Sequence, residues 1–114
     1  FDALVEIDGI DFMPEAPYGK CTRWLTTLTV DPSITSVNRI QIIEALEKEN
    51  IEARPVWKPM HMQPFYKGCE YVTVSCEDIS KRLFQNGLCL PSGSSLSELD
   101  QDRIINIILY LLKY

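Results

Sequence analysis

The side chains best suited to bind a polar ligand are gathered in residues 54–65, which read R-P-V-W-K-P-M-H-M-Q-P-F. This segment holds Arg54, Trp57, Lys58 and the single histidine of the chain, His61. Its three prolines exclude a helix, because proline donates no backbone N–H and biases the preceding residue toward extended geometry. A stiff, extended segment with polar and aromatic side chains is typical of a ligand-contacting loop. The same pattern also fits an edge strand leading into an ordered loop, with Trp57 as a core residue.

Motifs that would make the chain an enzyme by itself are missing from the sequence. No serine lies in a G-x-S-x-G elbow, and there is no G-x-G-x-x-G loop, P-loop or H-E-x-x-H pair. Nucleophilic catalysis needs a histidine base aligned by a third group, and the residues around His61 do not indicate one. Lys58 is a formal candidate for a Schiff-base lysine, since a desolvated amine is nucleophilic.

Composition places the chain among acidic globular domains. It has 114 residues, a net charge of −5 and four cysteines without C-x-x-C spacing, for which we expect buried free thiols and no metal site. An acidic chain is a poor general binder of nucleic acid, because it has no basic face for the phosphates. The longest apolar run, residues 104–112, is much shorter than the roughly 20 residues of a membrane span. We therefore expect one domain that binds neither nucleic acid nor membrane.

Periodicity predicts three strands and three helices in alternation. Strands are expected over residues 24–30, 51–57 and 88–90, where β-branched and aromatic residues gather. Helices are expected over residues 36–50, 76–86 and 97–113, where apolar residues recur at three- and four-residue spacing. This order favours a small two-layer α+β domain, a short sheet with helices packed on one side. The pattern does not fix the directions of the strands.

Three stretches of the sequence carry a resemblance to a known family. They are R-P-V-W-K-P-M-H-M-Q-P at residues 54–64, W-L-T-T-L-T-V at residues 24–30 and G-L-C-L-P-S-G-S-S-L-S at residues 87–97. Together they resemble the C-terminal part of the DegT/DnrJ/EryC1/StrS sugar aminotransferases. Within that family the chain is most similar to members that aminate nucleotide-linked keto-sugars for surface-glycan or pilin glycosylation.

The resemblance implies a fold and a division into domains. It implies the C-terminal small domain of a fold-type I aminotransferase, with a mainly antiparallel sheet, over residues 22–114. Residues 1–21 would be a connector from a large N-terminal domain that the chain does not include, with Leu4, Val5, Ile7 and Ile10 left exposed. In the family, that large domain carries the pyridoxal phosphate lysine, the phosphate-binding residues and the aspartate that pairs with the pyridinium. This chain would then hold no catalytic or cofactor-binding residue, and alone it would be inactive and bind no cofactor.

The resemblance also implies substrate contacts for the four polar and aromatic residues of the central segment. His61 would hydrogen-bond a sugar hydroxyl, and Arg54 would pair with a phosphate or sugar oxygen. Trp57 would form an apolar wall, and Lys58 would be a second phosphate contact or simply solvated. A surface salt bridge of Arg54 with a helix glutamate is the plainer alternative for that residue.

At the level of the whole protein, two functions stay open. The resemblance implies a cytoplasmic homodimer that uses pyridoxal phosphate, a nucleotide-sugar substrate and glutamate as amino donor. The alternative is a non-catalytic protein-interaction module that binds a partner through apolar residues near both ends of the chain.

Overall fold

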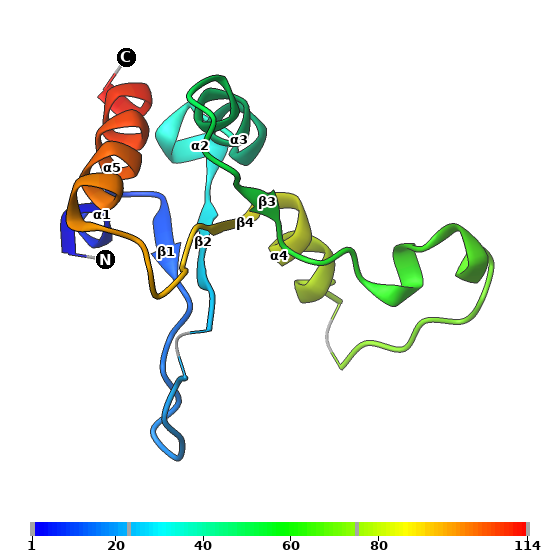
Figure 1. The fold of residues 1–114 in the computed structure, drawn as a ribbon. Helices are drawn as coiled ribbons and strands as arrows, with labels where there is room; N and C mark the ends of the chain where they lie inside the picture. Colours follow the sequence, from blue (N-terminus) through cyan, green and yellow to red (C-terminus); the bar gives the residue numbers. More distant parts are fainter. Residues whose placement is uncertain (1, 23, 75, 114) are drawn as a thin grey trace.

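A computed structural model describes residues 2–22, 24–74 and 76–113 and contains a four-stranded antiparallel sheet in the order β1-β2-β4-β3 (Figure 1). The strands are β1 (Ile10–Phe12), β2 (Thr26–Val30), β3 (Arg54–Pro55) and β4 (Gly87–Leu90). The helices are α1 (Asp2–Val5), α2 (Pro32–Thr35), α3 (Arg39–Lys48), α4 (Ile79–Asn86) and α5 (Glu98–Lys113), with short 3-10 helices at Met60–Met62 and Pro64–Tyr66. The predicted α+β class and the antiparallel sheet implied by the resemblance are both confirmed.

One face of the sheet forms the hydrophobic core. Leu28 pairs with Leu88 and Ile10 with Val30, so these side chains project to the same side of the pleated sheet. Helices α1, α3 and α5 cover this side and contribute buried residues of their own, namely Leu4, Ile42, Leu46, Ile104 and Ile108. Burial of these apolar side chains is the main stabilising term for a domain of this size.

The other face of the sheet carries smaller and more polar side chains. Cys89 pairs with Thr27 of β2 on one side and with Arg54 of β3 on the other. Because neighbouring side chains along a strand alternate between faces, these three lie opposite the core residues Leu28 and Leu88. Thr27 and Cys89 are half-buried and Arg54 is exposed. This face is therefore available for a site.

The helix predicted over residues 36–50 begins later than expected. Asp31 caps the short helix α2 by accepting from the backbone N–H of Ser33, and α2 ends at Ser36 in a left-handed conformation. The expectation of one helix capped by Ser36 was thus wrong. Instead, Asn38 caps α3 and forms a reciprocal capping box with Gln41, which satisfies backbone donors at the helix start.

Two further predicted elements are shorter in the structure. The strand predicted over residues 51–57 is reduced to β3, in which Arg54 pairs with Cys89 and Pro55 with Leu88. Pro55 has no N–H and so makes one fewer ladder bond at this edge. The helix predicted from residue 76 begins as α4 at Ile79, because the Asp78 side chain caps it by accepting from the backbone N–H of Lys81. The final helix is close to its prediction, and its start carries the Ser97 and Asp100 capping pair.

The N-terminal residues pack on the same core as the rest of the chain. Strand β1 adds an edge to the sheet, and Leu4 and Ile10 are 2% and 4% exposed. The expectation that these apolar residues would be left exposed was wrong for Leu4 and Ile10. Ile7 is half-buried against the core, whereas Val5 is exposed. The role of residues 1–21 as a connector to a larger domain stays a prediction.

The shape of the molecule is extended, because two segments project from the sheet (Figure 1). The radius of gyration is 15.5 Å, whereas a compact chain of this length has about 13 Å. The projecting segments comprise residues 13–22 and residues 57–74, and both expose large apolar side chains such as Tyr18, Phe65 and Val72. Within the ranges that the structure describes, none of the helices has the length and hydrophobicity to cross a membrane.

Candidate functional site

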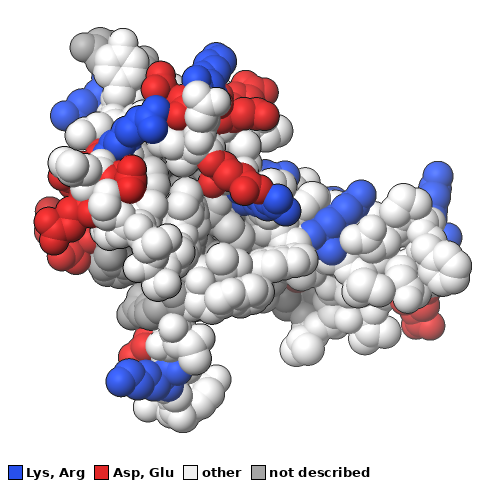
Figure 2. Space-filling view, viewed as in Figure 1, with Lys and Arg blue, Asp and Glu red and all other residues white. Residues whose placement is uncertain are grey.

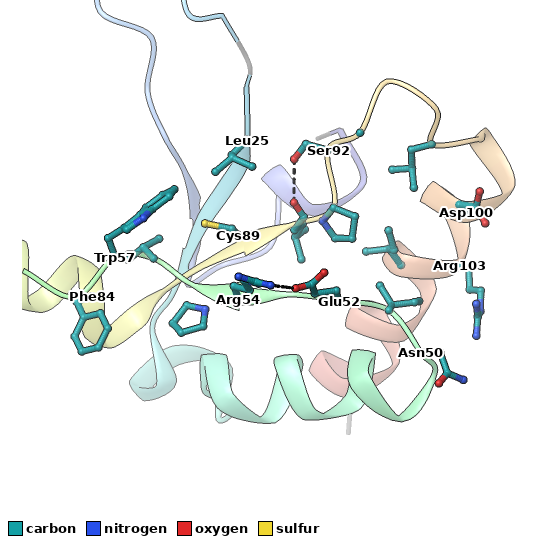
Figure 3. Close-up of a pocket in the computed structure, with 18 of the residues that line it drawn as sticks. Leu25, Asn50, Glu52, Arg54, Trp57, Phe84, Cys89, Ser92, Asp100 and Arg103 are labelled. Atoms are coloured by element: carbon teal, nitrogen blue, oxygen red, sulfur yellow. Dashed lines mark hydrogen bonds and ion pairs between the residues drawn. The ribbon is translucent and has the colours of Figure 1, made fainter.

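A groove with a volume of about 890 Å³ follows the edge strand β3 and the polar face of the sheet. Figure 3 shows Trp57 and Phe84 toward one end of the groove and Asp100 and Arg103 of α5 toward the other. The volume lies within the usual range of small-molecule sites, about 300–1,000 Å³. In the space-filling view of Figure 2 the charged side chains gather mainly over the helices, and the lower middle of the molecule is largely uncharged.

Arg54 projects into this groove from β3 and is held by a neighbouring carboxylate. Its guanidinium donates to Glu52, and the two side chains are 77% and 71% exposed (Figure 3). Glu52 lies in the connection between α3 and β3. The alternative prediction, a salt bridge between Arg54 and a glutamate of a helix, is therefore correct in kind but wrong about the location of the glutamate. An exposed ion pair of this kind is worth only about 0–1 kcal/mol. An anionic ligand can therefore replace Glu52 as the partner of Arg54 at little cost.

Trp57 forms an aromatic surface together with Trp24, which lies two residues before the start of β2. The two ring centroids are 6.0 Å apart and the ring planes are inclined by 31°. Trp57 is 66% exposed and Trp24 is 73% exposed, so the interpretation of Trp57 as a core residue was wrong. Sequence reasoning missed the contribution of Trp24, although the pairing of β2 with β4 and of β4 with β3 brings the two indoles together. Exposed aromatic faces of this kind suit a sugar or a base.

Lys58 also lines the groove, and its side chain is solvated. Its backbone carbonyl accepts from the Gln63 side chain at 3.2 Å. Among the described residues, its ammonium has no hydrogen-bond or ion-pair partner. Residues 54–58 thus contribute one paired cation, Arg54, and one solvated cation, Lys58, to the groove. A further cation, Arg103, lines its other end and is paired with Glu49.

His61 lies outside the groove, in the segment that projects from the sheet. Its Nε2 is 2.8 Å from Oδ2 of Asp78, and its ring stacks on Tyr71 with centroids 3.7 Å apart. The His61 and Asp78 side chains are 19% and 26% exposed, which makes this the most sheltered contact between a carboxylate and a side-chain nitrogen base among the described residues. Sequence reasoning missed Asp78 and Tyr71, because nothing in the pattern indicates that residues seventeen apart in an irregular loop meet.

The Asp78 carboxyl is ionised at neutral pH. Desolvation acts to raise its pKa, but hydrogen bonds outweigh this and hold the pKa below its usual value. These bonds come from the backbone N–H of Lys81, the hydroxyl of Ser80 and the His61 imidazole. The carboxylate therefore accepts from a helix terminus and from the imidazole at the same time.

The four predicted site residues thus fall into two groups. Arg54, Trp57 and Lys58 line one groove, whereas His61 is held by Asp78 at the start of α4. A role in substrate binding stays a prediction for all four.

The four cysteines are thiols, and they are less buried than predicted. Cys69 and Cys76 are exposed, while Cys21 and Cys89 are half-buried. Cys89 lies in the groove beside Arg54, and desolvation raises the pKa of its thiol. Because Cys89 lines the groove, the reactivity of its thiol depends on how well the groove shelters it from solvent.

Comparisons with known proteins agree on one family. Residues 2–109 match the sequence profile of the DegT/DnrJ/EryC1/StrS aminotransferase family. The chain is 44% identical over 115 residues to a Bacillus subtilis (strain 168) protein, EpsN, whose name describes it as a pyridoxal phosphate-dependent aminotransferase. It is 34% identical over 89 residues to GDP-perosamine synthase from Caulobacter vibrioides. These matches cover 96% and 76% of the chain, respectively.

The fold is likewise similar to that of a solved aminotransferase. A crystal structure of a DegT DnrJ EryC1 StrS aminotransferase from Brucella abortus matches 99% of the chain with a TM-score of 0.76 and 30% identity. The chain spans only 28% of that structure, and 28% and 22% of the lengths of the two relatives above. Each match is therefore to a minor part of a longer protein.

The groove predicts an order of thiol reactivity. The thiolate is the reactive form, so a raised pKa and partial burial both slow the reaction of Cys89. In the folded chain at mildly alkaline pH, we expect iodoacetamide to modify Cys69 and Cys76 before Cys89, as followed by peptide mass spectrometry. In guanidinium chloride the three rates should converge. Equal rates in the folded chain would show that the groove does not shelter Cys89.

Proposed function

The chain belongs to the DegT/DnrJ/EryC1/StrS aminotransferase family, and from this we propose that it is the C-terminal small domain of an enzyme that aminates a nucleotide-linked keto-sugar. Residues 22–114 would form this domain and residues 1–21 its connector. The observation that carries the proposal is the family match over residues 2–109. The likeness to GDP-perosamine synthase supports a nucleotide-sugar substrate, and we assign the product to surface polysaccharide or glycoprotein glycan biosynthesis.

The described residues do not fit the pyridoxal phosphate that the family uses. When bound, this cofactor acts as an electron sink, and it needs a lysine for covalent attachment and a partner for its ring nitrogen. The lysine of the groove, Lys58, is exposed, so the groove offers no sheltered lysine for this attachment. We therefore place the cofactor site in another part of the longer protein and assign substrate contacts to this chain.

The groove offers the groups that a nucleotide sugar requires. The planar fork of Arg54 suits the oxygens of a phosphate, and the solvated ammonium of Lys58 adds a second positive charge nearby. The Trp24 and Trp57 rings present an apolar surface to a sugar or base. His61 would hydrogen-bond a sugar hydroxyl from the projecting segment. Two partners that the family resemblance implies belong to the same proposal. They are glutamate as amino donor and a second subunit in a cytoplasmic homodimer.

A second candidate function is a non-catalytic protein-interaction module. The apolar residues near the chain ends, expected to form its partner surface, are largely buried in the core, among them Leu4 and Ile108. The exposed apolar side chains of the two projecting segments favour it instead, because apolar patches of this kind mark interaction surfaces. An enzyme domain that packs against a larger domain would expose the same side chains. Cofactor binding by the longer protein separates the two candidates.

The direct test is to purify the longest protein that the gene encodes beside the 114-residue chain and to add pyridoxal phosphate to both. We expect the longer protein to develop the visible absorption band of bound cofactor and to lose it when glutamate is added. The 114-residue chain should stay colourless under the same conditions. A longer protein that never takes up the cofactor would refute the aminotransferase proposal and leave the interaction module.

A second test addresses Arg54 in the longer protein. Arg54→Ala should raise KM for the nucleotide sugar about 10- to 100-fold, because a hydrogen-bonded contact with a charged group is lost. The matched control is Arg82→Ala, which removes another exposed arginine paired with one glutamate, Glu77. Steady-state kinetics with the sugar as varied substrate give both values. Equal KM values for the two variants would show that Arg54 does not contact the substrate.

A further inference from the structure

The two carboxylate oxygens of Asp78 accept hydrogen bonds from different groups. Oδ1 accepts from the backbone N–H of Lys81 and from the hydroxyl of Ser80, each at 2.9 Å, and so caps α4. Oδ2 faces Nε2 of His61 at 2.8 Å. An ionised carboxylate can only accept hydrogen bonds, so the proton of this contact must lie on Nε2. The carboxylate that caps α4 thereby requires a proton on Nε2 of His61.

When the imidazole is neutral, the other nitrogen of His61 is left as a hydrogen-bond acceptor. A neutral imidazole has one N–H, so a proton on Nε2 leaves a lone pair on Nδ1. Among the described residues, Nδ1 has no hydrogen-bond partner. Of the described side-chain nitrogens and oxygens, the one that is fully buried without a partner is Nε of Arg39. Nδ1 of His61 is therefore not fully buried.

Tyr71 fixes the plane of the imidazole. Its ring stacks on His61 with an interplanar angle of 13°. The Tyr71 hydroxyl is 3.1 Å from the hydroxyl of Ser80 and 3.4 Å from Oδ1 of Asp78, which ties the ring to the start of α4. The imidazole is therefore held on one face and at one edge, and its free edge is the one that carries Nδ1.

We propose that Asp78 is a positioning residue that holds His61 with its proton on Nε2, so that Nδ1 accepts a hydrogen bond from a hydroxyl of the substrate. This rests on the function proposed above and specifies the group that His61 recognises. A neutral imidazole held in this way selects a donor, a sugar O–H, over a phosphate oxygen, which could only accept. Arg54 and Lys58 then serve the anionic part of the substrate, and His61 serves the sugar ring.

The substitution Asp78→Asn tests the proposal with little change in shape. Asparagine is as good a helix cap as aspartate, so its carbonyl oxygen should keep the bonds to Lys81 and Ser80. Its amide NH₂ then lies where Oδ2 was and donates to His61, which forces the proton onto Nδ1. Asp31→Asn is the matched control, because Asp31 also caps a helix through a backbone N–H and a serine hydroxyl, remote from His61 in sequence.

Nitrogen-15 NMR of the 114-residue chain reads the tautomer directly, since the chain has a single histidine. At a pH where the imidazole is neutral, we expect the Nε2–H tautomer in the wild type and in Asp31→Asn, and the Nδ1–H tautomer in Asp78→Asn. A wild type with its proton on Nδ1, or a tautomer that does not respond to Asp78→Asn, would overturn the proposal. Thermal melting shows whether each variant remains folded.

Kinetics of the longer protein test the consequence for the substrate. Asp78→Asn should lower kcat/KM for the nucleotide sugar about 10- to 100-fold, because Nδ1 then carries a proton and no longer accepts from the substrate hydroxyl, and Asp31→Asn should leave it unchanged. Asp78→Ser, which keeps a capping oxygen but is too short to reach His61, should also lower it. A tautomer that switches without a change in kcat/KM would overturn the role toward the substrate. A longer protein with no transaminase activity on any keto-sugar refutes the proposed function instead, and the NMR result still decides whether Asp78 sets the tautomer.

Discussion

The arrangement of the site depends on the close approach of three elements at Gly87, the first residue of β4. Helix α4 runs directly into β4 at this position, and the backbone N–H of Val56 donates to the Gly87 carbonyl at 3.2 Å. A Cβ at Gly87 would collide with the carbonyl of Leu83 and with the side chain of Val56. The absence of a side chain thus lets the edge strand and the helix meet. The groove at β3 and the Asp78 contact at the far end of α4 take their relative positions from this junction.

Much of the fold can be predicted from the sequence, because its elements carry strong local signals. The alternation in β4 places Leu88 in the core and Cys89 on the polar face, and the apolar spacing of α3 and α5 predicts helices that cover one side of a sheet. Helix starts were less predictable, since several polar residues compete to cap the chain near Ser36. Strand β1 escaped prediction because it has only three residues.

The candidate site could be predicted only in part, for a physical reason. Arg54, Trp57 and Lys58 are close in sequence and lie on one extended segment, so their common groove follows from local geometry. The contacts that hold Trp57 and His61 are with residues distant in the sequence. The order of the strands in the sheet places Trp24 beside Trp57, and the path of an irregular loop places Asp78 beside His61. Residue types and spacing do not encode the path of such a loop. The role of Asp78 as a helix cap hides its second contact, because one carboxylate oxygen suffices for capping.

The central claim is that this chain recognises the sugar substrate while the cofactor chemistry lies elsewhere in the protein. The most direct measurement follows the two halves of transamination separately in the His61→Ala variant of the cofactor-loaded longer protein. The account predicts an unchanged rate for the half-reaction with the amino donor, together with a strongly reduced rate for the half-reaction with the nucleotide-linked keto-sugar. Equal losses in both halves would contradict it, because His61 would then support the cofactor site or the fold instead of the substrate.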